Sequence, residues 1–126
     1  MSILGLDFGV KRLGLAISSG FLAQPLHVLP NNSKVFTNLK NICLSNKTEK
    51  IVIGIPEGKL RERVKEFAKS CQQQLGLDVE FEDEILTTVK AQSLLIQSRS
   101  TRAKRKRIVD AAAAAVILQQ YLDRNQ

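Results

Sequence analysis

Two short apolar runs joined by a charged, glycine-containing turn stand at the start of this chain of 126 residues. The first run ends near Asp7 and the second continues to residue 17, with Gly9 between them to permit a tight turn. This pattern predicts a β-hairpin. A carboxylate in so apolar a setting needs a cation or hydrogen-bond donors to compensate its charge. Asp7 is therefore either an ordinary turn aspartate or part of a metal or phosphate site, with Lys11 and Arg12 near the anion.

Apolar periodicity predicts the rest of the fold. The expected elements after the hairpin are a strand at 21–29, a helix over 35–43, strands at 51–55 and 79–82 separated by a helix over 60–75, and helices over 87–98 and 108–122. Pro25 makes the strand at 21–29 an edge or bulged strand. This order predicts an α/β fold, in which crossover helices add parallel strands to the hairpin and cover both faces of a mixed central sheet. The length suits one domain over residues 1–126.

The two cysteines and the absence of long apolar runs indicate the cellular compartment of the protein. Cys43 and Cys71 fall at apolar helix positions with no C-x-x-C pattern, so we expect reduced core residues. No apolar run approaches the roughly 20 residues that span a bilayer, and no charged prefix precedes an apolar core as in a secretory leader. We expect a soluble, cytoplasmic protein with no membrane partner.

The positive charge is concentrated in one short run. The net charge is +7, and six of the nineteen cations lie between residues 99 and 107 with no acid among them. These six cations are Arg99, Arg102, Lys104, Arg105, Lys106 and Arg107. A basic run of this kind favours a polyanion such as nucleic acid, because each neutralised phosphate releases counterions. We expect a mobile segment that grasps a phosphate backbone; the alternative is a solvated loop or helix end.

Three acids stand where the predicted fold can bring them to one edge of the sheet. Asp7 is near the end of the first strand, Glu84 follows the last strand, and Asp110 is expected in the first turn of the final helix. Converging carboxylates favour Mg²⁺ or Mn²⁺, and two such ions about 3.5 to 4 Å apart can clamp an in-line phosphoryl displacement. Each acid also has a simpler interpretation: Asp110 suits a helix N-terminus, and Asp83 is a rival to Glu84.

Four stretches of the chain resemble the YqgF family, also called RuvX. They are D-F-G-x-K-R-x-G at 7–14, I-G-I-P at 53–56, Asp83-Glu84 followed by L-T-T at 86–88, and D-A-A-A-A at 110–114 ahead of I-L-Q-Q-Y-L at 117–122. The resemblance implies a ribonuclease H-like fold with Asp7, Glu84 and Asp110 as catalytic, metal-binding acids. It also implies hydrolysis of phosphodiester bonds in the 5′-end maturation of small-subunit ribosomal RNA, with structured RNA or assembly intermediates as partners. Holliday junction cleavage, on branched DNA, is the rival assignment.

Two departures from the family pattern keep other functions open. Ile85 stands where the family has an arginine beside the glutamate, and the loop at 57–59 is shorter than usual. Both departures favour a non-catalytic module that binds nucleic acid during ribosome assembly, whereas the three acids favour a nuclease. A third possibility, an actin-like ATP-binding protein, needs two lobes, and this chain has the length of one.

Overall fold

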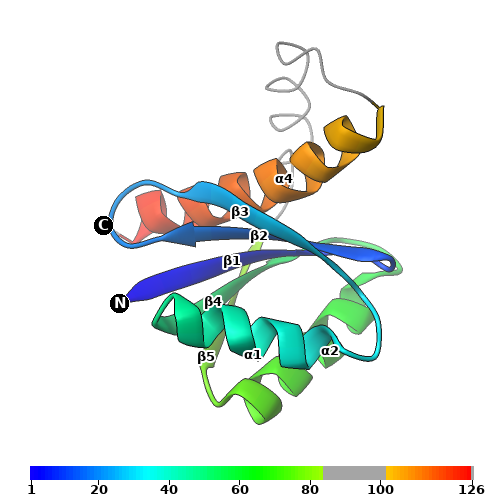
Figure 1. Ribbon diagram of the computed structural model, residues 1–126, viewed down its shortest axis with the longest axis horizontal. Coiled ribbons are helices and arrows are strands. Elements are labelled where there is room, and N and C mark those ends of the chain that lie inside the picture. The colour runs from blue at the N-terminus through cyan, green and yellow to red at the C-terminus, as the bar shows by residue number, and fades with distance from the viewer. Residues whose placement is uncertain (84–101, 126) are drawn as a thin grey trace.

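The computed structural model describes residues 1–83 and 102–125, which form one mixed sheet covered by helices (Figure 1). In chain order the elements are β1 (Ser2–Phe8), β2 (Arg12–Ser18), β3 (Gln24–Pro30), α1 (Val35–Ser45), β4 (Thr48–Ile55), α2 (Arg61–Leu75), β5 (Asp78–Asp83) and α4 (Arg102–Arg124). The sheet has five strands in the order β3-β2-β1-β4-β5. The helix expected over 87–98 lies outside the described residues.

The strand pairing confirms the predicted hairpin and crossovers. β1 pairs with β2 antiparallel and with β4 parallel, and β4 pairs with β5 parallel. β3 is an edge strand, and its register against β2 shifts beside Pro25, as a proline without an N–H donor requires. α2 ends at Gly76, whose φ of 68° is the left-handed conformation that glycine supplies at helix ends.

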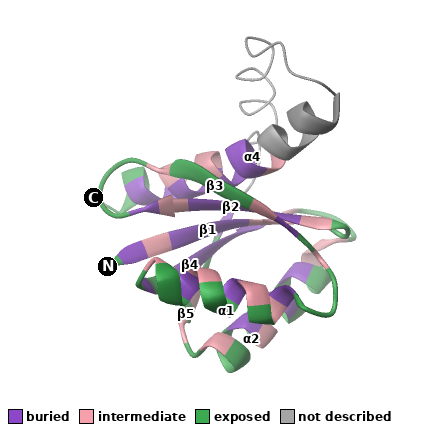
Figure 2. Ribbon diagram, in the orientation of Figure 1, coloured by how far each residue is buried: buried purple, intermediate pink, exposed green. Residues whose placement is uncertain are grey.

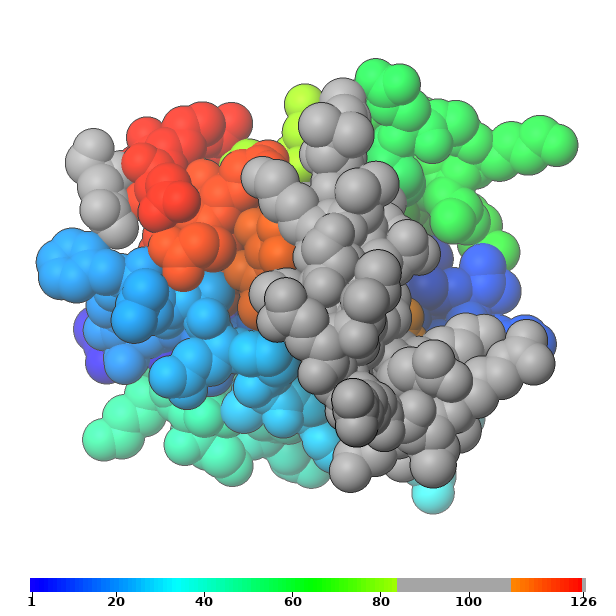
Figure 3. Space-filling view, turned by 90° about the horizontal axis from the view of Figure 1, so that it is seen from above, coloured from blue at the N-terminus to red at the C-terminus, as the bar shows by residue number. Residues whose placement is uncertain are grey.

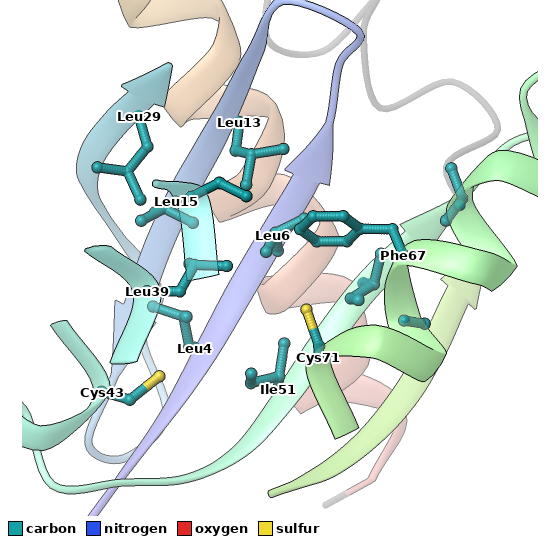
Figure 4. Packing of buried hydrophobic residues seen from close by; sticks show 14 of the residues in the cluster. Leu4, Leu6, Leu13, Leu15, Leu29, Leu39, Cys43, Ile51, Phe67 and Cys71 are labelled. Carbon is teal, nitrogen blue, oxygen red and sulfur yellow. The ribbon is translucent and has the colours of Figure 1, made fainter. Parts of the chain in front are cut away.

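α1 and α2 cover one face of the sheet and α4 covers the other (Figure 1). Between the sheet and α1 and α2 lies the larger core, in which leucines of β1 and β2 pack against Leu39 and Phe67 (Figure 4). Figure 2 shows the same division, with buried residues along the central strands and exposed ones on the outer helix faces. Cys43 and Cys71 belong to this core as buried free thiols, and burial raises the pKa of Cys71 to about 12. Among the described residues, no helix is long and apolar enough to cross a membrane.

α4 lies directly on the sheet because the facing residues are small. A Cβ added to Gly5 would stand 2.7 Å from the Cβ of Leu118 and 3.0 Å from the carbonyl oxygen of Ala114. A Cβ added to Gly14 would stand 1.9 Å from the carbonyl oxygen of Asp110, closer than any real contact. The alanines at 111–114 are all buried. Glycine on the strands and alanine on the helix therefore let the two backbones touch.

The start of α4 corrects two expectations. The helix begins at Arg102, so Asp110 lies about two turns inside it rather than in its first turn. The cations at 102–107 form the opening turns of α4 and not a segment ahead of it. Arg99 lies outside the described residues. Because Asp110 is inside the helix, its position is fixed by helix packing rather than by a capping role.

A polar network fastens the later part of α4 to β4 and β5. The Tyr121 hydroxyl donates to Glu80 Oε2 at 2.5 Å, and Lys50 Nζ lies 2.7 Å from the same oxygen and donates to the Tyr121 oxygen at 3.1 Å. The hydrogen bonds from Lys50 and Tyr121 lower the pKa of Glu80, and the hydrogen bonds to Glu80 and Tyr121 raise the pKa of Lys50. This network holds α4 across the sheet at a distance from Asp110.

Candidate functional site

Asp7 lies on the face of the sheet that α4 covers, and the backbone of Asp110 in α4 rests on Gly14, the strand partner of Asp7. Side chains alternate along a strand, so Asp7 shares the face of Gly5, which is the face that α4 covers. Gly14 is the strand partner of Asp7, and the backbone of Asp110 rests against Gly14. Residues paired across antiparallel strands have Cα atoms about 4.5–5.5 Å apart. The missing side chain at Gly14 thus lets α4 bring its acid beside the acid of β1.

Arg12 connects the cationic turn to α4. Its Nε donates to Oδ2 of Asp110 at 3.0 Å, and the two side chains are 33% and 25% exposed. Arg12 was expected at a substrate anion, and in this structure it pairs with a carboxylate of the chain itself. Lys11, expected beside it, is exposed at the tip of the turn. One cation is therefore paired within the site, and the other faces solvent.

The turn at 9–11 is held by a residue that the sequence did not single out for this purpose. The backbone N–H of Asn31 donates to the carbonyl of Lys11 at 2.9 Å, and its side-chain Nδ2 donates to the carbonyl of Gly9 at 2.8 Å. Asn31 lies just ahead of the helix expected over 35–43 and carried no predicted role in the site. Its spacing from the turn in sequence offers no signal, because the contact depends on β3 returning alongside β2.

The end of β5 lies at the same edge as Asp7. Leu6 is level with Ile53 and Glu82 with Gly54, so Asp7 and Glu82 stand at the same height with β4 between them. Glu82 is only 3% exposed and points toward α4, where Gln120 Nε2 donates to it at 2.7 Å and Arg124 pairs with it at 2.5 Å. The acidic cluster at the end of β5 is thus not simply solvated.

Asp83 belongs to the opposite face of the sheet. Phe81 lines a groove with residues of α2, and strand alternation puts Asp83 on that same side, away from α4. Its backbone carbonyl accepts a hydrogen bond from Gln120 at 3.0 Å. Glu84 is the next residue in the chain and lies outside the described residues, as does Arg99. The geometry therefore disfavours Asp83 as a partner of Asp7.

The described part of the chain contains two of the three expected metal ligands. No group of three or more His, Cys, Asp or Glu side chains able to hold a metal is formed among residues 1–83 and 102–125. Asp7 and Asp110 both offer carboxylate oxygens, the donors that Mg²⁺ and Mn²⁺ prefer. This donor set fits a hard cation, and Glu84 is left as the candidate for a third ligand.

Comparison with known proteins gives matches over the whole chain. A family profile described as "RuvX: Holliday junction resolvase" matches residues 1–124. A protein of Clostridium botulinum (strain Alaska E43 / Type E3), named "Putative pre-16S rRNA nuclease", is 43% identical over 134 aligned positions that cover 98% of each chain. A protein of Streptococcus mutans with the same name is 39% identical over 137 positions, covering 98% of this chain and 99% of its own.

Solved structures confirm the expected ribonuclease H-like fold. Thermus thermophilus RuvC in complex with a Holliday junction substrate has a TM-score of 0.65 at 13% identity, covering 100% of this chain and 97% of RuvC. Fowlpox virus resolvase, in complex with Holliday junction DNA, has a TM-score of 0.63 at 11% identity and covers 99% of both chains. At these identities the likeness establishes the architecture, a RuvC-like mixed sheet with helices on both faces.

Proposed function

This chain belongs to the RuvX family, and from that membership we propose that it is a metal-dependent nuclease that hydrolyses phosphodiester bonds in the precursor of small-subunit ribosomal RNA. The observation that carries the proposal is that Asp7 and the Asp110 backbone both lie next to Gly14, beside a turn that carries Lys11 and Arg12. Two carboxylates and two cations at one sheet edge are the groups that a metal-assisted reaction on a phosphate needs.

Asp7, Asp110 and Glu84 are the residues that would hold Mg²⁺ or Mn²⁺. When bound, such a cation supplies positive charge opposite the phosphate and acidifies a water molecule. The protein contributes the fixed position of the carboxylates: β1 sets Asp7, and close packing of α4 on Gly14 sets Asp110. Lys11 and Arg12 then contribute positive charge that attracts and orients the phosphodiester.

The basic opening turns of α4 extend this surface. The cations at 102–107 precede Asp110 on the same helix, so a phosphate backbone bound along them would lead toward the two acids. With Arg99 they form the proposed substrate-binding set, together with Lys11 and Arg12. Figure 3 views the molecule from the α4 side, where the helix lies next to β2 and β3.

The Asp7→Asn variant tests the proposal because it keeps the shape of the side chain and removes one charge. We expect it to abolish Mn²⁺-dependent cleavage of a labelled ribosomal RNA precursor while the protein remains folded. It should also melt at an equal or higher temperature than the parent without metal, since repulsion between the acids is relieved. Glu84→Gln and Asp110→Asn should behave alike, whereas Asp83→Asn serves as the matched control and should cleave normally. Cleavage by Asp7→Asn at the parental rate would disprove the nuclease proposal.

A second candidate is cleavage of branched DNA. It is favoured by the description of the matching family profile as a Holliday junction resolvase. A four-way DNA junction placed beside the RNA precursor in the same assay distinguishes the two substrates. Binding of either nucleic acid without any metal-dependent cleavage would instead identify a non-catalytic module for ribosome assembly.

A further inference from the structure

The hairpin turn at residues 9–11 is held in place by Asn31. Across this turn the described residues show one backbone hydrogen bond from another element, from the N–H of Asn31 to the carbonyl of Lys11 at 2.9 Å. The side chain of Asn31 adds a bond to the carbonyl of Gly9 at 2.8 Å. Asn31 therefore forms hydrogen bonds to both ends of the turn. A three-residue hairpin tip is otherwise a place where backbones move readily.

The turn that Asn31 holds carries the two cationic side chains that are proposed to bind the phosphate. Lys11 is at its exposed tip, and Arg12, the next residue, reaches Asp110 on α4. The turn is tightly closed, because a Cβ on Gly9 would stand 2.5 Å from the carbonyl oxygen of Arg12. A change in the direction of the Lys11 or Gly9 carbonyl would therefore also turn the two cationic side chains.

We propose that Asn31 is a positioning residue for nucleic acid binding. Its two hydrogen bonds fix the 9–11 turn, so that Lys11 and Arg12 can bind a phosphate without further loss of conformational entropy in the turn. This inference rests on the proposed function, because it assumes that a phosphodiester binds at the edge formed by Asp7 and Asp110. Preorganised groups bind more tightly because less conformational entropy is lost on association. The role of Asn31 is separate from that of the acids, since its two hydrogen bonds within the described part of the chain go to backbone carbonyls of the turn.

The Asn31→Ala variant removes the side-chain bond and keeps the backbone one. We expect its affinity for a structured RNA, measured by fluorescence anisotropy in EDTA, to fall about fivefold, the equivalent of one ordinary hydrogen bond. Asn46→Ala is the matched control, because Asn46 Nδ2 makes a bond of the same 2.8 Å length to the carbonyl of Ile42. Asn46 lies beside Ser2, at the start of β1, whereas Asp7 lies near its end.

Asn31→Asp provides a second variant of nearly the same shape. It replaces the donor by an oxygen that faces the Gly9 carbonyl, so its affinity should fall at least as far as that of Asn31→Ala. Melting temperatures of all three variants identify any loss that follows from unfolding alone. Equal RNA affinity for the Asn31 variants and Asn46→Ala, at matched folded fraction, would overturn the inference.

A mutant cycle shows whether Asn31 acts through the turn. In a background that carries both Lys11→Ala and Arg12→Gln, Asn31→Ala should cost less than twofold in RNA affinity, because both groups that it positions are already gone. The same fivefold loss in both backgrounds would overturn the inference. The outcome is independent of catalysis: a parent protein that binds RNA and never cleaves it disproves the nuclease proposal, and the cycle still decides the role of Asn31.

Discussion

Arg12 Nε donates to Asp110 Oδ2 at 3.0 Å and so joins the first residue of β2 to the helix that crosses it. Both side chains are partly exposed, and an ion pair of this kind contributes only about 0–1 kcal/mol to folding. Its larger effect is on the site, because it places a permanent positive charge beside a carboxylate proposed to bind metal. Under the proposed function, Asp110 would hold the metal ion and the Arg12 guanidinium at the same time.

Replacing Arg12 by glutamine should therefore change metal affinity and nucleic acid affinity in opposite directions. We expect Mn²⁺ affinity of the protein alone to rise about 3- to 10-fold, since a neighbouring positive charge is removed. RNA affinity should fall, because a phosphate contact is lost. Electron paramagnetic resonance of unbound Mn²⁺ measures the first effect and anisotropy the second. Arg63→Gln, at an exposed position on α2, is the control, and an unchanged or lower Mn²⁺ affinity for Arg12→Gln would contradict this assignment.

The basic start of α4 predicts how RNA affinity depends on salt concentration. Neutralising four of its cations together should reduce the slope of log affinity against log salt concentration for RNA by up to about 3, because fewer counterions are released. The four changes are Arg102, Lys104, Arg105 and Lys106 to glutamine. The control neutralises the same number of charges among exposed lysines in and beside α1 and α2, namely Lys40, Lys47, Lys65 and Lys69. A slope that falls equally in both proteins would show that total charge, and not this helix, sets the binding.

Glu80 makes the free energy of unfolding depend on pH in the acid range. Hydrogen bonds from Lys50 and Tyr121 lower its pKa, so the folded state favours the ionised form. That contribution is complete above the pKa of the unfolded chain, about 4.3, and is lost as pH falls through the lower folded value. Glu80→Gln should therefore be less stable than the parent at pH 7, with the difference shrinking between about pH 5 and pH 3. Urea unfolding across this range measures it; Glu49→Gln, at an exposed position of β4, should follow the parent.

Local patterns were enough to predict the hairpin, the parallel strands and the core faces of α1, α2 and α4. These features follow from apolar spacing and from residues such as Pro25 and Gly76, whose backbone preferences act within a few positions. The acids at 7 and 110 could be singled out as candidate site residues from the sequence, because each is a carboxylate beside apolar residues, and their role in a site stays a prediction. What could not be predicted was the start of α4, since the cations at 102–107 carry no apolar period.

Contacts between segments far apart in the chain could not be predicted from the sequence. Arg12 and Asp110 are 98 positions apart, and Asn31 reaches Gly9 only because two strands run side by side. Glu82 stands among several acids in the sequence, yet Gln120 donates a hydrogen bond to it and Arg124 forms an ion pair with it, both from α4. Alternation along β5 then separates Glu82 from Asp83, which no local pattern could assign to a face before the sheet was known.

The glycine beneath α4 carries the most specific prediction. In Gly14→Ala the new methyl group would collide with the Asp110 carbonyl oxygen, at 1.9 Å, and a backbone carbonyl cannot swing aside as the end of a flexible side chain can. We expect a loss of about 2–3 kcal/mol or more in the free energy of unfolding, because α4 must lift from the sheet. The lift also moves Asp110 away from Asp7, so cleavage should fall by about 100-fold even where the protein is still folded.

Gly20→Ala is the matched control for Gly14→Ala, since a Cβ at Gly20 meets nothing within 4 Å among the described residues. It should change stability by less than about 0.5 kcal/mol and leave cleavage intact. Urea unfolding and cleavage of the RNA precursor, both at a temperature where each variant is folded, provide the two readouts. If Gly14→Ala were as stable and as active as Gly20→Ala, close packing of α4 on β2 could not be what brings the two acids together.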